Sequence, residues 1–523
     1  MRTLLLLLAT CAAARAGEPV ADPATCGLPC DAYAVVRLAS PQRLDAIGRD
    51  LQPLLDLAGE SRALGDVLLP LVNAARLPVD RSQPVYVAFG PSGTVSLLKA
   101  LPGTAPEDVR AAPGARIAPV LLDSGWITVR EPAGGDRRFA TNFSRGVPLL
   151  EGDASVCVLM GTVLDRHRAR LEEALARVTQ AEELAPGAGV TIPRSVTRLL
   201  RVVAAKTLEG VLGVENIHYA LTWRDGRLES EAWIRSREGS SLRRWLARYG
   251  DAKPGSPMGF LPQRAFWMVE SSGSTASLDA DVEALLDEAF GAGAGRALLL
   301  LLSPSYALHE HLTGRAAGVV VVQGMMAAAM RSLHEVKPEA PIEAAIRAID
   351  TEKVNGLLAG IEIPLTVELQ RAAGRLGDTE YHRLRYRSSN PQWMMFVAQM
   401  DTCFAVHGRY LLVAQSATSE TDLRALLDRV RSGTPAEHPH DAAMARLMPD
   451  RLEGLSINLG TLKPVLGLVA MTAPEAAPYV RAFPDDLYLS TALAVRDGHI
   501  HLRGDWPLKE VVEYAVKAAK LQR

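Results

Sequence analysis

Residues 217–233 read IHYALTWRDGRLESEAW, and residues 489–505 read LSTALAVRDGHIHLRGD. In each stretch an Asp-Gly pair, Asp225-Gly226 or Asp497-Gly498, separates two runs in which apolar side chains alternate with polar ones. Asp-Gly readily adopts the two positive φ angles that a two-residue hairpin turn requires, so each stretch predicts a β-hairpin. A helical pattern follows each hairpin, at 242–249 and at 508–520. The sequence therefore predicts the same hairpin–helix unit twice.

Two further segments repeat in the same order along the chain. The strand–helix pattern of residues 33–57 returns at residues 266–280, and the strand pattern at 155–160, which leads into a helix, returns at 410–415. This shared order of strand–helix, strand–helix and hairpin–helix predicts a tandem duplication. The alternative is that a composition rich in Ala, Leu and Arg imitates a repeat.

The stretch 251–263 separates the two copies and is poorly suited to either helix or strand. It contains Pro254, Gly255, Pro257, Gly259 and Pro262. We place a Pro/Gly linker there, between repeat domain 1 at 33–250 and repeat domain 2 at 264–523. Hairpins outnumber parallel crossovers, so the predicted fold class is α+β, with two tandem related domains, each a mainly antiparallel sheet covered by helices.

The first 16 residues have the three parts of a secretory signal peptide. Arg2 supplies the positive start, Leu4 to Leu8 the apolar region, and Ala14-Arg15-Ala16 the small residues before cleavage. We expect cleavage after Ala16 and a periplasmic or secreted mature chain. The alternative is a lipoprotein acylated at Cys11, because residues 8–11 approximate a lipobox. No later apolar run has the length of a transmembrane helix, so we expect no transmembrane segment in the mature chain.

Four cysteines remain after such cleavage. Cys26 and Cys30, in the N-terminal segment 17–32, could form a disulfide outside the cytoplasm. Cys157 and Cys403 lie in apolar strand patterns, which is typical of buried thiols. The net charge of −2, with both signs interspersed, leaves no basic surface, and we expect no nucleic-acid partner.

Two His-x-His pairs are the candidate metal ligands. They are His309 with His311, and His499 with His501. Alternate residues of a strand share a face, so two imidazoles could bind one metal ion. Zinc needs three or four ligands, and the nearest extra histidine, His334, is predicted to lie in a helix beyond a turn. We therefore expect no bound metal and no cofactor.

Short patterns that resemble catalytic motifs occur in the wrong structural context. Residues 90–94 approximate the nucleophile elbow G-x-S-x-G, but a strand, not a helix, is predicted to follow. Residues 96–99 fit S-x-x-K, yet in a strand Ser96 and Lys99 point to opposite faces. The segment His438-Pro439-His440-Asp441 predicts a solvated loop. The catalytic residues, if the protein has any, therefore remain unknown from linear motifs.

The repeated strand–helix units and closing hairpins loosely resemble a class of exported bacterial proteins known only as domains of unknown function. The resemblance covers most of the mature chain. It implies the duplicated α+β architecture, and the class brings no catalytic residue that could be transferred to this sequence.

We expect an exported, non-catalytic protein that binds a protein or a small apolar ligand between its two duplicated domains. One alternative is a hydrolase whose residues assemble only in space, and another is a structural component of the envelope or surface. Polar side chains that converge in a deep pocket would favour the hydrolase, an apolar groove the binding protein, and a featureless surface the structural component.

Overall fold

The computed structural model describes residues 20–22, 32–57, 77–90, 93–110, 118–130, 147–180, 194–249, 255–273, 276–323, 327–360, 363–391 and 397–522. The expected signal peptide, the alternative lipid site at Cys11 and the Cys26–Cys30 pair lie outside these ranges. Export, acylation and the disulfide therefore stay predictions. Cys157 and Cys403 are free, buried thiols, and burial raises their pKa values to about 12 and about 11.

Residues 34–236 form the first half of a sheet. Its strands are β2 (Ala34–Leu38), β3 (Val85–Gly90), β4 (Gly93–Lys99), β5 (Ala118–Leu121), β6 (Trp126–Arg130), β8 (Ala154–Val158), β9 (Val214–Arg224) and β10 (Arg227–Ser236). Two short strands, β1 (Val20–Asp22) and β7 (Val147–Leu149), pair separately. The predicted hairpin at residues 85–99 is confirmed, since β3 and β4 pair with Gly90 opposite Gly93.

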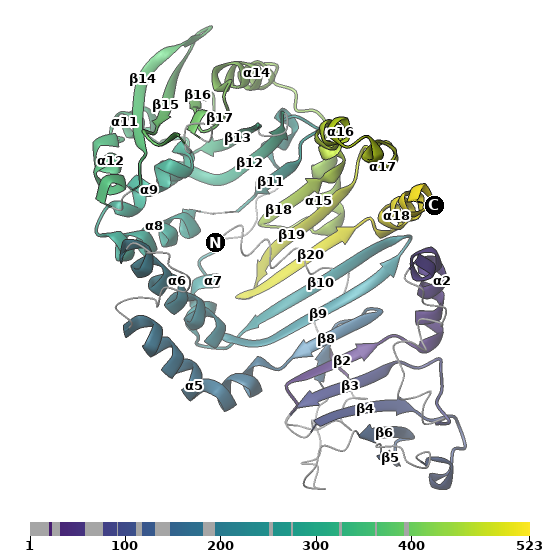
Figure 1. Ribbon diagram of the computed structural model, residues 1–523. Helices are drawn as coiled ribbons and strands as arrows, with labels where there is room; N and C mark the ends of the chain where they lie inside the picture. The colour runs from purple at the N-terminus through teal and green to yellow at the C-terminus, as the bar shows by residue number, and fades with distance from the viewer. Residues whose placement is uncertain are drawn as a thin grey trace.

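Residues 267–506 form the second half. Its strands are β11 (Trp267–Ser271), β12 (Leu312–Val322), β13 (Ala328–Val336), β14 (Thr366–Leu376), β15 (Thr379–Arg387), β16 (Thr402–His407), β17 (Tyr410–Gln415), β18 (Glu453–Asn458), β19 (Tyr488–Arg496) and β20 (His499–Trp506). In the described residues, strand pairing joins both halves into one antiparallel sheet of 18 strands (Figure 1). The predicted α+β class with antiparallel pairing is confirmed at this level.

The order of strands matches on the two sides of the central pair, β10 and β20. Outward on one side it runs β10, β9, β8, β2, β3, β4, β6, β5. On the other side it runs β20, β19, β18, β11, β12, β13, β17, β16, and the hairpin of β15 and β14 is added at the end. The match of the strand at 155–160 with the strand at 410–415 was wrong, because β18 and not β17 takes the position of β8.

The pairing of β10 with β20, which we call the seam, joins the two halves. Its register places Glu231 opposite Arg503. If Asp497 is the counterpart of Asp225 in the second half, then Arg503 is the counterpart of Glu231, because each lies six residues further along the chain. Glu231 therefore pairs with its own counterpart at the seam. The two strands are therefore related by a local two-fold axis through this pair.

The predicted hairpin turns are confirmed on both sides of the seam. Asp225 and Gly226 have φ values of 51° and 80°, and Asp497 and Gly498 have φ values of 51° and 73°. These positive angles are those of the two-residue turn that matches the twist of antiparallel strands. The local Asp-Gly signal therefore fixed both hairpins.

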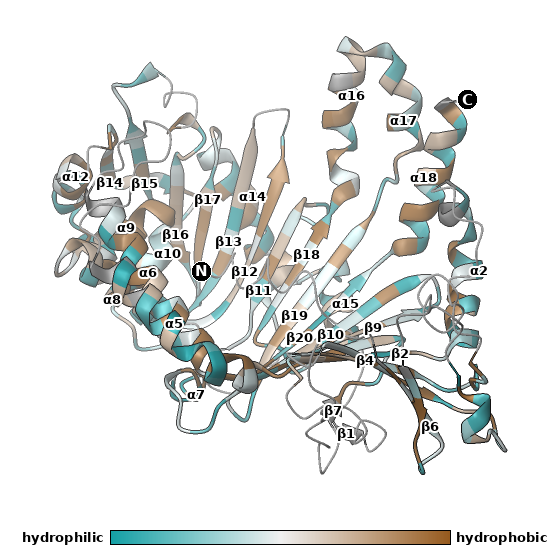
Figure 2. Cartoon of the chain, turned by 60° about the horizontal axis from the view of Figure 1, so that its bottom comes forward, coloured by the Kyte–Doolittle hydropathy of each residue, from teal (hydrophilic) through white to brown (hydrophobic). Residues whose placement is uncertain are grey.

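Helices gather mainly in two rows at opposite ends of the strands (Figures 1 and 2). One row contains α5 (Met160–Gln180), α6 (Arg194–Leu212), α8 (Ala276–Phe290) and α9 (Ala294–Leu302), and the other α2 (Pro41–Leu57), α16 (Lys463–Thr472), α17 (Ala477–Ala482) and α18 (Leu508–Gln522). The remaining α-helices are α7 (Ser241–Leu246), α10 (Pro304–Ala307), α11 (Ile342–Arg347), α12 (Thr351–Gly360), α14 (Ser419–Arg431) and α15 (Pro439–Leu447). Short 3-10 helices are η2 (Pro106–Asp108), η4 (Pro257–Phe260), η5 (His309–His311), η6 (Leu459–Leu462) and η7 (Pro474–Ala476).

One face of the sheet, which we call the covered face, is closely packed. In the second half, α14 packs on it through Leu423 and Leu427, and α15 packs through Met444 against Ala492 and Ala494 of β19. In the first half, its side chains form a buried cluster with β7 and the turn between β5 and β6. The covered face thus carries buried apolar clusters on both sides of the seam.

Each hairpin turn beside the seam is contacted by a helix of the other half. The Lys509 amide at the start of α18 donates to the Gly226 carbonyl at 2.8 Å. A β-carbon at Gly498 would lie 3.0 Å from the Arg243 side chain of α7, and the Ser236 hydroxyl at the end of β10 donates to the Gly498 carbonyl at 2.5 Å. A β-carbon at Gly226 would lie 2.8 Å from the Lys509 β-carbon. The missing side chain at Gly226 therefore permits α18 to pack on the turn.

Gly226→Ala is expected to lower the free energy of unfolding more than Gly408→Ala does. Both glycines have positive φ, 80° and 55°, where alanine costs about 1–2 kcal/mol. Only at Gly226 does the new methyl group collide with a neighbour, since nothing lies within 4 Å of a β-carbon at Gly408. Urea unfolding should show a further loss of about 1–3 kcal/mol for Gly226→Ala. An equal loss in both variants would contradict the packing of α18 on this turn.

Candidate functional site

The face opposite the covered face, which we call the apolar face, is aliphatic. It is buried at both ends of the sheet, against α9 and α12 in the second half and around Leu77 and Val109 in the first, and it is half-buried between them. Its half-buried members are Val36, Val87, Val156, Val158, Ile217, Leu221, Leu228, Ile234, Trp267, Val269, Val320, Ile457, Leu489 and Leu493. Cross-strand registers keep these residues on one side of the sheet, as in the series Trp267, Ile457 and Leu489 on β11, β18 and β19. Figure 2 shows brown, apolar stretches on the strands between the two rows of helices.

Helices cover the apolar face only in part. At the seam, α7 packs on Ile500 and Leu502 through Leu246. At the far end of the same strands, α2 and α18 enclose Trp223. On either side of these contacts, aliphatic side chains of β2, β8, β11 and β18 stay half-buried, namely Val36, Val156, Val158, Val269 and Ile457, whereas Leu455 of β18 is 2% exposed.

An antiparallel sheet with one solvated face normally alternates apolar and polar side chains. Here both faces of β8, Ala154–Val158, and of β19, Tyr488–Arg496, carry mostly small or apolar residues. Contiguous apolar surface of this kind is uncommon on soluble monomers and marks interaction sites. The apolar face is therefore the candidate binding surface.

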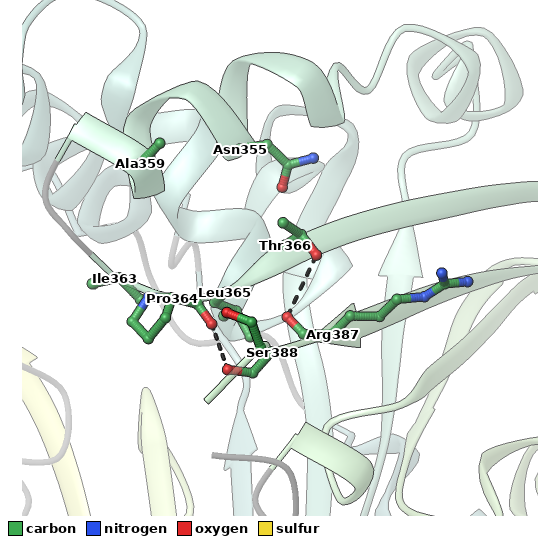
Figure 3. A pocket seen from close by; sticks show the side chains of 9 residues that line it. Asn355, Ala359, Ile363, Pro364, Leu365, Thr366, Arg387 and Ser388 are labelled. Atoms are coloured by element: carbon green, nitrogen blue, oxygen red, sulfur yellow. Dashed lines mark hydrogen bonds between the residues drawn. The ribbon is translucent and has the colours of Figure 1, made fainter. Parts of the chain in front are cut away.

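Three pockets in the described residues each lie within one half of the chain. The first, of about 550 Å³, lies between α12 and the start of β14 and is lined by Asn355, Ala359, residues 363–366 and residues 387–389 (Figure 3). The Ser388 hydroxyl donates to the Pro364 carbonyl, and the Thr366 hydroxyl to the Arg387 carbonyl. The Asn355 amide bonds both the N–H and the carbonyl of Val367. These polar groups therefore bond the backbone of β14 and the residues beside it, and they do not converge on the cavity.

The other two pockets are smaller and also lie each within one half. One of about 360 Å³ is lined by charged residues of α5 and α6, including Asp165, Arg168 and Glu209. One of about 440 Å³ combines Arg264 and Lys463 with apolar residues near the ends of β11 and β12. Lys463 is already paired with Asp485 at 3.0 Å. The 360 Å³ pocket also includes Ser240 and Ser241 at the start of α7, where Ser240 caps the helix by accepting the Arg243 amide.

Buried charge lies on the covered face at the seam. The Glu231 carboxylate is fully buried and accepts hydrogen bonds from His501 Nε2, from Trp233 Nε1 at 3.1 Å and from Arg503 Nη2 at 3.3 Å. The His501 and Trp233 rings stack with their centroids 4.2 Å apart. Burial lowers the pKa of His501, and the neighbouring Glu231 carboxylate opposes that shift.

A second polar cluster lies beneath α15 and has the residue types of a hydrolase triad. Ser456 Oγ lies 2.8 Å from His440 Nδ1, and His440 Nε2 lies 3.6 Å from Glu270 Oε1. Burial raises the pKa of Glu270, but hydrogen bonds and charge from His440 and Arg451 outweigh burial and bring the pKa down to about 2. Burial, together with the Glu270 carboxylate, raises the pKa of Asp441 to about 6.

The geometry of this cluster does not permit acyl transfer as it stands. Ser456 and His440 are both 0% exposed, and none of the three pockets includes either side chain. A nucleophilic serine must reach the substrate carbonyl, with an oxyanion-binding site beside it. The cluster instead holds α15 on the sheet, because His440 and Asp441 belong to the first turn of that helix.

Three of the four candidate metal ligands contact other groups. The strand expected for His309 and His311 was wrong, because both lie in η5, where His309 Nδ1 contacts the Tyr306 carbonyl at 2.8 Å. His499 and His501 do share a face of β20, but His499 Nδ1 accepts from the Ser236 amide and His501 contacts Glu231. The search of the described residues finds no group of three or more His, Cys, Asp and Glu placed to hold a metal ion.

Two other expectations about histidines were wrong. His334 lies in β13 and not in a helix. His438 and His440 are buried, because Pro439 begins α15 and the His438 ring accepts the His440 amide as the helix cap. A proline in the first helical turn after a side chain that can cap the helix was the available signal. Glu231, Glu270 and Ser456 come from separate strands and form no linear motif.

Comparison with known proteins identifies no family for this chain. No family model matches the chain, and no curated protein is similar to it. Among the helices in the described part of the chain, none combines the length and apolarity needed to cross a bilayer.

The chain is distantly similar to crystal structures of TP0453. Crystal form III matches with a TM-score of 0.22 and 9% identity, over 50% of this chain and 98% of that chain. Crystal form I has a TM-score of 0.22 and 10% identity, over 50% and 96%, and form IV has 0.21 and 10%, over 52% and 98%. A TM-score this low carries no argument about the function of this chain.

Asp441→Asn is expected to raise the free energy of unfolding at pH 7.5 by about 1–2 kcal/mol. The folded protein binds the Asp441 proton more tightly than the unfolded chain does, since the pKa of this carboxyl is raised to about 6. The stability that protonation adds is complete below the unfolded pKa, near 4, and is lost as pH rises through about 6. Denaturant titrations at pH 4 and pH 7.5 should show the two proteins converging at the lower pH.

Glu475→Gln is the control for this comparison, because Glu475 is an exposed carboxylate on η7. Its removal should change the free energy of unfolding little at either pH. A stability difference between Asp441→Asn and the parent that did not vary with pH would refute the assignment.

Proposed function

We propose that this protein is exported and non-catalytic, and that it binds an aliphatic ligand on the apolar face. The observation that supports this proposal most strongly is the half-buried aliphatic surface on both sides of the seam, on strands that lie between two rows of helices. Burial of such surface contributes roughly 25 cal/mol per Å², so an apolar occupant would gain most of its affinity there. Export itself rests on the signal pattern of residues 1–16.

A tandem duplication of two α+β domains, with a boundary at 251–263, underlies this site in our proposal. Three observations support it. The strand order matches outward from the seam, the two Asp-Gly turns correspond, and Glu231 pairs with its counterpart Arg503. The ligand surface then consists of two related lobes, one from each domain.

The side chains of the apolar face favour an elongated aliphatic ligand, such as an acyl chain. Valine, leucine and isoleucine dominate its half-buried positions, and Trp267 is the single aromatic member of the set named above. Sugars are usually recognised by stacking on aromatic rings, and nucleotides by charged or polar contacts, which these side chains do not offer. A protein partner is the alternative occupant.

The hydrolase alternative depends on the Ser456–His440–Glu270 cluster. Its burial under α15 argues against it, since a substrate could reach Ser456 only if the helix left the sheet. No observation favours the structural envelope component over the binding protein.

Protein isolated from an envelope fraction is expected to carry a non-covalent aliphatic ligand and to begin at Gly17. Native mass spectrometry, followed by solvent extraction, measures both properties on one sample. Cis-parinaric acid, a fluorescent fatty acid, should then bind the extracted protein. Val269→Gln should weaken that binding about tenfold, because a polar amide would enter the apolar face beside Leu455 and Gly318.

Val511→Gln is the matched control, because Val511 is 39% exposed on α18. It should leave binding of the fatty acid unchanged. Equal affinity of Val269→Gln and the parent protein would refute the assigned face. A bound polypeptide in place of an aliphatic compound would replace the ligand proposed here, and an acylated N-terminal Cys11 would overturn the processing.

A further inference from the structure

The local two-fold axis at the seam passes through one pair of corresponding residues and relates the pairs on either side of it. Glu231 of β10 faces its counterpart Arg503 of β20, and Trp233 faces His501, the counterpart of Glu229. The backbone register is therefore symmetric, while the side chains at the axis have opposite charge. Backbone pairing alone would suit two copies of the same half equally well.

A seam between two copies of the same half would differ from the observed seam at its buried centre. Two copies of the first half joined through β10 in this register would place Glu231 opposite Glu231. Two copies of the second half would place Arg503 opposite Arg503. Glu231 is fully buried and the Arg503 side chain is 17% exposed, so neither like pair could hydrate its charges well.

We infer that the seam is an interaction surface that accepts the other half of this chain and rejects a second copy of the same half. The discriminating contact is the buried pair of Glu231 and Arg503. Like charges in contact at a desolvated site cost several kcal/mol, and removing one partner of a buried pair leaves the other uncompensated. This inference is independent of the ligand, because the pair lies on the covered face and not on the apolar face.

Such discrimination is needed because β10 and β20 each lie at the edge of the strands of their own half. Before they meet, β10 and β20 are both exposed edge strands, 10 and 8 residues long. Long edge strands pair readily with other chains, and charged side chains at the edge are a usual safeguard. Here the charged side chain at the edge becomes part of the contact between the halves, because Arg503 and His501 of the second half both donate to Glu231.

The test uses the full chain, with a protease recognition sequence replacing residues 251–254 and cleavage after folding. The two fragments should remain a 1:1 complex in native mass spectrometry and size-exclusion chromatography. Arg503→Glu and Glu231→Arg should each weaken the complex at least about tenfold, because like charges then meet at the axis. The double variant, Glu231→Arg with Arg503→Glu, should recover most of the affinity.

Arg383→Glu is the control for charge reversal. Arg383 binds the Asp401 carboxylate at 2.6 Å, is 26% exposed, and lies on β15, away from the seam. It should leave the fragments associated. Where a charge-reversed chain fails to fold, Glu231→Gln and Arg503→Gln replace it, and the double Gln variant should lose less affinity than the two single losses added together. Single variants that bind as tightly as the parent, or double variants without recovery or coupling, would overturn the inference.

Discussion

The pairing of β10 with β20 is the constraint on which the rest of the structure depends. It joins two sets of strands into one sheet, and the Glu231 carboxylate is buried at its centre. A buried carboxylate is tolerated only where charge and hydrogen-bond donors compensate for lost hydration. Arg503, His501 and Trp233 provide them. A slip of one residue would turn Glu231 toward the apolar face, so the cluster also fixes the register.

This arrangement places the buried charge and the half-buried aliphatic side chains on opposite faces of the sheet. On the covered face, a row of residues runs from Glu231 through Arg503, Ala492 and Gly454 to Glu270. The small residues in the middle leave room for α15, since a β-carbon at Gly454 would lie 2.5 Å from the Met444 sulfur. Charged and polar groups are thus enclosed under helices on the covered face, and the half-buried aliphatic side chains lie on the opposite face.

Local signals predicted much of the fold but little of the buried chemistry. Asp-Gly turns and strand–helix periodicity depend on a few neighbouring residues, and they identified the hairpins at 225 and 497 and the helices that follow. Strand partners depend on distant contacts, and an apolar pattern like that of β8 occurs in both β17 and β18. The Glu270, His440 and Ser456 cluster draws on three separate elements, so no spacing along the chain could reveal it.

Hydrogen exchange of the backbone amides of β10 and β20 tests the central claim most directly. If the seam is a continuous part of one sheet, these amides should exchange as slowly as those of their neighbours, β9 and β19, and all four strands should open together. Fast exchange in β10 and β20, with slow exchange in β9 and β19, would show two sheets whose edges meet without a shared hydrogen-bond ladder. That result would contradict the account.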